Sequence, residues 1–156
     1  MERQRMKRFV TAALFAAALA APAFADDQAA ANEKCNIKAN EQVAASMPPE
    51  TPADQKQMVT EMVTDMCGCI TSKVAEIGDD GMAVLHVMAV QPDEDWLVQD
   101  EAEQMKRAIA LLVSETGMSE ADATALYDRV NPKMKEISAS CQQEAQAKMM
   151  EKMTPK

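Results

Sequence analysis

Two cysteines separated by one glycine, Cys67-Gly68-Cys69, constrain this chain more than any other feature of its sequence. They lie in a segment, residues 53–77, whose apolar residues recur at three- and four-residue steps: Val59, Met62, Val63, Met66, Ile70, Val74 and Ile77. That spacing predicts one face of an α-helix. Residues two apart on a helix point about 200° away from each other, so Cys67 and Cys69 cannot be joined while this helix is intact.

The other two cysteines, Cys35 and Cys141, lie far from this helix in the sequence. An even number of cysteines in an exported chain predicts disulfides. On a helical wheel, Cys67 and Cys69 fall about 70° and about 90° to either side of the centre of the apolar stripe. We therefore predict two structural disulfides, one to the segment around Cys35 and one to the last helix through Cys141. Which of Cys67 and Cys69 takes which partner is left open.

The N-terminus, residues 1–25, has the pattern of a secretory signal peptide. Four basic residues precede an uncharged apolar stretch, and Ala23-Phe24-Ala25 places small residues at the two positions that a signal peptidase reads. We predict cleavage before Asp26, because the apolar stretch is too short for a membrane anchor. A compact, alanine-rich signal favours the periplasm of a Gram-negative bacterium, with no stable membrane insertion after the signal is removed.

Removal of that signal leaves a strongly acidic chain with few aromatic residues. Four basic residues and one acidic residue leave with it, so the formal net charge changes from −9 to −12. Such a charge disfavours binding to nucleic acid. All three phenylalanines lie in residues 1–25, so Trp96 and Tyr127 are the only aromatic residues after them. The core must therefore be built from aliphatic residues and methionine.

The rest of the sequence predicts an all-α fold, a small bundle of four to five helices stapled by two disulfides. Residues 26–52 are polar and end in prolines, so we expect a loosely held arm with one helical stretch near residues 33–46. The bundle domain is expected over residues 53–156. Its helices are predicted at about 53–77, 82–90, 93–116 and 119–131, followed by a last one that begins at Pro132 or continues through it.

Glycines and polar residues mark the helix ends. Gly78 and Gly117 are expected at the C-terminal ends of two helices, and Ser119 with Asp122 resembles a capping box. The apolar run at 82–90 would also suit a buried strand, but no partner strand is predicted, which favours a helix. In the helix at 93–116, the residues expected to face inward are Val98, Ala102, Met105, Ile109, Leu112 and Val113.

The methionines supply the first hypothesis on function. Met58, Met62 and Met66 recur at four-residue steps, and flexible thioethers adapt to varied apolar partners. We expect a non-enzymatic periplasmic binding module, chaperone-like or an adaptor in an envelope complex, with this Met/aliphatic face as the candidate site for a protein partner. The same spacing would also suit plain core residues. No nucleophile elbow, phosphate loop or His-Glu metal motif indicates an enzyme, and no cofactor is expected.

Two other functions stay open. Thioether, imidazole and thiolate ligands suit copper, and the candidate ligands are His86, Met88, Cys67 and Cys69. The Cys-x-Cys pair would alternatively form the strained, oxidising disulfide of a thiol-disulfide redox protein. No thioredoxin-like βαβ pattern surrounds it, which favours structural disulfides.

An acidic stretch separates Lys73 from Lys106, with no lysine or arginine between them. Several of its carboxylates fall at predicted helix N-termini, where the helix dipole favours them. The alternative is a docking patch for a basic partner or for a divalent cation.

Overall fold

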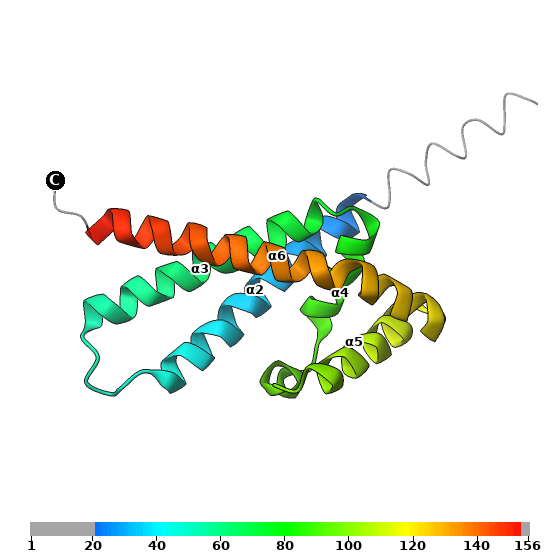
Figure 1. The fold of residues 1–156 in the computed structure, drawn as a ribbon, viewed down its shortest axis with the longest axis horizontal. Coiled ribbons are helices and arrows are strands. Elements are labelled where there is room, and N and C mark those ends of the chain that lie inside the picture. The colour runs from blue at the N-terminus through cyan, green and yellow to red at the C-terminus, as the bar shows by residue number, and fades with distance from the viewer. Residues whose placement is uncertain (1–20, 154–156) are drawn as a thin grey trace, which may run out of the picture.

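The computed structural model describes residues 21–153, and its regular elements there are all helices (Figure 1). In chain order these elements, five α-helices and a short 3-10 helix η1, are α2 (Ala21–Ser46), α3 (Ala53–Ala75), α4 (Asp79–Val90), η1 (Asp93–Leu97), α5 (Glu101–Thr116) and α6 (Glu120–Met153). The predicted all-α bundle is therefore confirmed. Most of the predicted signal peptide lies outside the described residues, and the predicted cleavage site before Asp26 falls in the first turns of α2.

The longest helix, α6, runs along the whole molecule (Figure 1). α3 packs antiparallel to its C-terminal half, and α5 packs beside its N-terminal end. α4 contacts α2, α3, α5 and α6, so it is the central element. Its sequence suits this position, because it is mostly apolar and buries Leu85 and Val87.

The segment expected to be a loose arm is a full helix of the bundle. In α2, Ala31, Cys35, Ala39 and Val43 recur every four residues and pack against the core, with Ala31 and Cys35 buried. These small side chains let α2 lie close to α3 and α4. The prediction of a loosely held arm over 26–52 is wrong, because the polar composition of the segment hides this stripe. The helical stretch predicted near 33–46 ends where α2 ends.

Two disulfides tie α3 to its neighbours. Cys35 is bonded to Cys67, which joins α2 to α3, and Cys69 is bonded to Cys141, which joins α3 to α6. Their Cα–Cα distances are 5.8 Å and 5.7 Å, and no free cysteine remains among the described residues. The prediction that Cys67 and Cys69 are tied to different elements is confirmed. The pairing follows from the sides of α3 on which α2 and α6 lie.

The buried face of α3 is centred nearer to Cys67 than the apolar pattern predicts. Val63, Cys67, Thr71 and Val74 are buried, whereas Met62 is only half-buried. Thr71 is accommodated because its hydroxyl donates a hydrogen bond to the Cys67 carbonyl at 2.9 Å. The disulfide to α2 therefore draws its own flank of the helix into the core.

The segment 93–116 is not one helix. η1 ends at Leu97, the backbone is extended at Val98, and Asp100 caps α5 by accepting a hydrogen bond from the Glu103 backbone N–H at 2.8 Å. Within α5, Ala102 and Met105 are exposed, contrary to the prediction, while Leu112 is buried as predicted.

Gly78 was expected to end the helix at 53–77, but α3 ends at Ala75 with Glu76 as its C-cap, and Gly78, with φ of 94°, directly precedes α4. Other predicted features of the helix ends are confirmed. Residues 82–90 are helical, within α4. Gly117 has the left-handed conformation, with φ of 71°, at the C-terminal end of α5. Ser119 Oγ accepts a hydrogen bond from the Asp122 backbone N–H at 3.1 Å at the start of α6. Of the two alternatives for Pro132, the structure has the continuous helix.

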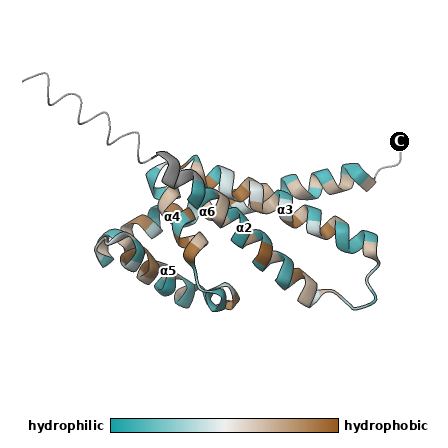
Figure 2. Ribbon diagram, turned by 180° about the vertical axis from the view of Figure 1, so that it is seen from behind, coloured by the Kyte–Doolittle hydropathy of each residue, from teal (hydrophilic) through white to brown (hydrophobic). Residues whose placement is uncertain are grey.

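Hydrophobic and hydrophilic residues are interspersed along the longer helices, as amphipathic packing requires (Figure 2). Within the described part of the chain, no helix combines the length and the apolarity that crossing a membrane would need.

Two glycines give a matched test of helix packing. A Cβ at Gly68 would meet nothing within 4 Å, whereas a Cβ at Gly81 would lie 2.0 Å from the Val74 carbonyl oxygen. We expect Gly68→Ala to raise the free energy of unfolding by about 0.5–1 kcal/mol, because alanine is the better helix former. Gly81→Ala should lower it by about 1–3 kcal/mol through overpacking. Urea unfolding measures both, and equal effects of the two substitutions would contradict this packing.

The disulfides are tested by removing one pair at a time. The sequence separation is 32 residues between Cys35 and Cys67 and 72 residues between Cys69 and Cys141. Removal of either disulfide should lower the free energy of unfolding by about 2–5 kcal/mol. Because the longer loop restricts the unfolded chain more, the loss for Cys69→Ala with Cys141→Ala should exceed that for Cys35→Ala with Cys67→Ala by about 0.7 kcal/mol. Peptide mapping under non-reducing conditions checks the pairing itself. A fragment with Cys67 joined to Cys69 would contradict the fold.

Candidate functional site

The short helix η1 follows directly on α4 and begins after Pro92. Its first turn holds Asp93, Glu94 and Asp95, which are favoured there by the helix dipole. It cannot extend into α5, because the backbone turns to the extended conformation at Val98. The side chains of this five-residue helix therefore point in several directions. Asp93, Asp95 and Trp96 contact different helices of the bundle.

Asp93 ties η1 to α2. Lys34 Nζ lies 2.7 Å from Asp93 Oδ1, and Lys38 Nζ lies 2.9 Å from Asp93 Oδ2. Because the two lysines are four residues apart, they lie on one face of α2 and share this carboxylate. Their hydrogen bonds lower the pKa of Asp93 from its ordinary value of 3.8. Hydrogen bonds from Lys38 to Glu41 and Asp93 raise the pKa of Lys38, so Lys38 and Asp93 both stay charged at neutral pH.

Asp95 ties η1 to α5. Its carboxylate is only 9% exposed and accepts a hydrogen bond from the guanidinium of Arg107, which also pairs with Glu103 at 2.9 Å. A carboxylate this buried needs such a partner, since an uncompensated charge would be costly. η1 is therefore held between α2 on one side and α5 on the other.

Trp96 anchors η1 through packing. Its ring packs against the cluster of buried residues around the Cys35–Cys67 disulfide, including Val63. Its backbone carbonyl accepts a hydrogen bond from Gln42 Nε2 at 3.0 Å. The indole N–H is buried and has no hydrogen-bond partner among the described residues, so apolar contact, not hydrogen bonding, fixes the position of the ring.

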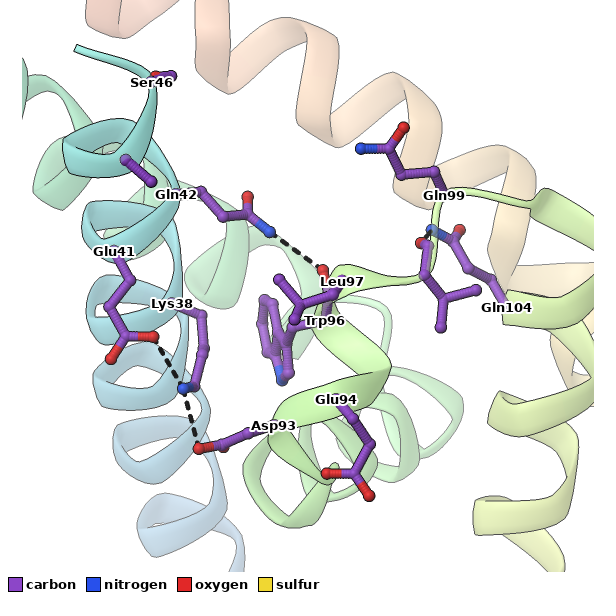
Figure 3. Close-up of a pocket in the computed structure, with 12 residues that line it drawn as sticks. Lys38, Glu41, Gln42, Ser46, Asp93, Glu94, Trp96, Leu97, Gln99 and Gln104 are labelled. Carbon is purple, nitrogen blue, oxygen red and sulfur yellow. Dashed lines mark hydrogen bonds and ion pairs between the residues drawn. The ribbon is translucent and has the colours of Figure 1, made fainter. Parts of the chain in front are cut away.

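A groove of about 1010 Å³ opens between α2 and η1 (Figure 3). Its α2 wall carries Lys38, Glu41 and Gln42, and Trp96 and Leu97 lie opposite (Figure 3). The other lining residues are Ala45, Ser46, Asp93, Glu94, Val98, Gln99 and Gln104.

Leu97 is the outlier of η1. It is 70% exposed, more than any other large hydrophobic residue in the described part of the chain. The neighbouring Trp96 packs against the core, and Asp93 and Asp95 are paired. The structure therefore fixes an apolar side chain at the edge of a groove without covering it.

The groove is acidic and rich in amides. Of its charged lining residues, Glu41 and Asp93 are paired with Lys38, and Asp93 also with Lys34, so Glu94 is the lining carboxylate for which the described residues provide no lysine partner. The side-chain N–H groups of Gln42 and Gln104 donate hydrogen bonds to the backbone carbonyls of Trp96 and Val98, respectively. Their amide oxygens keep the capacity to accept a hydrogen bond.

The predicted Met/aliphatic face lies elsewhere, between α3 and α6. Met58 and Met62 are half-buried and line a pocket of only about 10 Å³ together with Met149. A pocket of that size holds about one water molecule. Met66 is also half-buried. These methionines are mostly taken up by the contact between the two helices, and their role as a binding face stays a prediction.

The alternative copper ligands are not brought together by the fold. Cys67 and Cys69 are in separate disulfides. His86 Nδ1 lies 3.1 Å from Asp27 Oδ1, and its Nε2 lies 3.5 Å from Glu115. Met88 instead lines an apolar cavity. Within residues 21–153, no three His, Cys, Asp or Glu side chains are arranged to hold a metal.

Sequence reasoning missed the groove, although part of its signal is visible. Asp93-Glu94-Asp95-Trp96-Leu97 places an aromatic and an aliphatic residue directly after three acids and a proline. Continuous helical periodicity over 93–116 concealed the break at Val98. Lys34 and Lys38, four residues apart, could have suggested a shared acidic partner.

In comparisons with known proteins, no family model, no curated protein and no solved structure matches this chain. Its function is therefore inferred from the geometry of the site.

The attachment of η1 to α2 has a testable pH dependence. A carboxylate whose pKa is lowered in the folded state stabilises it above the ordinary value of 3.8, and this contribution is lost as the pH falls through the folded value. Asp93→Asn should therefore lower the urea midpoint at pH 7, with a smaller effect at about pH 2.5. Trp96 fluorescence reports the transition. The control is Glu50→Gln, in the exposed loop after α2, and an equal effect of Asp93→Asn at both pH values would contradict the attachment.

Proposed function

We propose that this protein is a non-enzymatic binding module of the periplasm that holds an extended segment of a partner protein in the groove between α2 and η1. The observation that carries the proposal is Leu97, 70% exposed at the edge of a groove of about 1010 Å³. An apolar anchor surrounded by polar groups is typical of protein interaction sites. Two disulfides and the signal-like N-terminus support a compartment outside the cytoplasm.

Rigid walls favour binding in this groove. The Cys35–Cys67 disulfide fixes α2, Asp93 links η1 to α2, and Asp95 links η1 to α5. A preorganised site loses less conformational entropy when a partner binds. The groove therefore acts as a fixed surface for an adaptor or chaperone-like module.

The chemistry of the groove indicates the chemistry of its partner. Glu94 in the groove, on a chain with a formal net charge of −9, attracts a basic segment. Leu97 and Trp96 offer an apolar contact for one aliphatic side chain. Glutamine amides along the groove suit the backbone N–H groups of an extended peptide. We expect a short, lysine- or arginine-rich segment with a central aliphatic residue.

The proposal is tested with a labelled hexapeptide that has one leucine among lysines, followed by fluorescence anisotropy. Leu97→Ser should weaken its binding about tenfold or more, because burial of a leucine side chain contributes about 1.5–3 kcal/mol. Raising the salt concentration should weaken binding further, since the groove and the peptide carry opposite charges. A peptide with glutamates in place of the lysines should not bind.

Two control variants separate this groove from other apolar surfaces. Ile37→Ser changes a residue of α2 that is 47% exposed but does not line the groove. Met58→Ser with Met62→Ser tests the face expected from the sequence. Both should bind the hexapeptide as the unmodified protein does. Unchanged binding by Leu97→Ser, or loss only with the methionine variant, would refute the groove as the site.

A further inference from the structure

A second cavity, separate from the groove interior, lies between α4, α5 and α6. It has a volume of about 200 Å³. Its walls are almost entirely apolar, and the large side chains among them are Met88, Leu112, Leu126, Val130 and Met134. Apolar cavities of about 150 Å³ are known to stay dry and to admit small apolar molecules.

A polar space of about 280 Å³, called the mouth below, borders this cavity. Gln91, Ala108 and Tyr127 line both spaces, and the mouth adds Asp95 and Arg107. Together the two spaces fall in the range of roughly 300–1,000 Å³ that is usual for small-molecule sites. An apolar interior behind a few polar groups is the usual anatomy of such a site.

The charges at the mouth are already balanced. The guanidinium of Arg107 is hydrogen-bonded to both Asp95 and Glu103, so it does not offer an unpaired cation to an anionic ligand. Asp95 is buried against the same guanidinium, so it does not offer an unpaired carboxylate to a cationic ligand. The remaining polar groups of the mouth are uncharged side chains such as Gln91 and Tyr127.

Tyr127 supplies a hydrogen-bonding group that stays neutral. Burial, and then the carboxylate of Glu101, raise the pKa of Tyr127 above its ordinary value of 10.0. The phenol is therefore protonated at neutral pH and can donate as well as accept a hydrogen bond.

From this arrangement we propose that the cavity binds a small, uncharged amphiphile, with its hydrocarbon part among Met88, Leu112 and Val130 and its hydroxyl, ester or amide group at Gln91 and Tyr127. The site is distinct from the proposed peptide groove, although Trp96 and Gln104 border both the groove and the mouth.

The first experiment uses 1-octanol as the probe and the unmodified protein. Trp96 is the only tryptophan of the chain, so its emission reports the mouth directly. We expect a saturable change in emission. In protein labelled with ¹³C at the methionine methyl groups, octanol should shift the signals of Met88 and Met134 and leave that of Met149 unchanged. Non-saturable binding, or shifts of Met149 alone, would overturn the proposal.

Matched variants of α5 locate the site. Ala108 lines both the cavity and the mouth, whereas Ala110 is exposed on the same helix. Ala108→Leu should weaken octanol binding at least tenfold by filling the space where the cavity and the mouth meet, and Ala110→Leu should leave it unchanged. Circular dichroism confirms that both variants are helical. If Ala108→Leu binds octanol as the unmodified protein does, the cavity is not the site.

The head group and the independence of the two sites are tested together. Octanoate and octylammonium should bind at least tenfold more weakly than 1-octanol, and tighter binding of either ion would refute an uncharged ligand. Leu97→Ser should keep octanol binding while it loses the hexapeptide. If Leu97→Ser loses octanol binding, the cavity is not independent of the groove. If the unmodified protein binds octanol but does not bind the hexapeptide, only the proposal for the groove is refuted.

Discussion

The fold depends on two disulfides that leave α3 in opposite directions. Cys67 and Cys69 are separated by one residue, so the helix itself directs one toward α2 and the other toward α6. A chain with no phenylalanine after residue 25 has limited aromatic area to bury, and covalent links between its helices compensate for a modest core. α4 then fills the centre of the frame that these links hold together.

Both proposed sites lie beside one five-residue helix. η1 is linked to α2 through Asp93 and to α5 through Asp95, and Trp96 packs against the disulfide-linked core. Leu97 is then left at the edge of the groove, while Trp96 and Asp95 border the mouth of the cavity. Because the same few contacts shape both spaces, a change in the position of η1 would alter both sites together.

Polar residues of the acidic stretch serve the fold as well as the groove. Asp100 caps α5, Asp80 pairs with Arg129, and Asp95 pairs with Arg107. This agrees with the expectation that helix N-termini explain several of these carboxylates. Asp93 is likewise paired, with Lys34 and Lys38, so Glu94 is the carboxylate of this stretch in the groove that supports a basic partner.

The features that could be predicted from the sequence depend on residues close together in the chain. Helical periodicity predicted α3, α4 and α6, and the 200° angle between Cys67 and Cys69 excluded a bond between them. The same local logic misjudged α2, because a stripe of alanine and cysteine carries a weak hydrophobic signal until close packing makes it useful.

By itself, the sequence determined the all-helical class, the acidity and the rule that two neighbouring cysteines must have different partners, because these follow from composition and from the geometry of a single helix. Only the tertiary structure decided which partners they take, that the helix at 93–116 breaks at Val98, and that Leu97 is left uncovered. The physical reason is that these features depend on contacts between residues distant in the chain, such as Lys34 with Asp93, which no local pattern specifies.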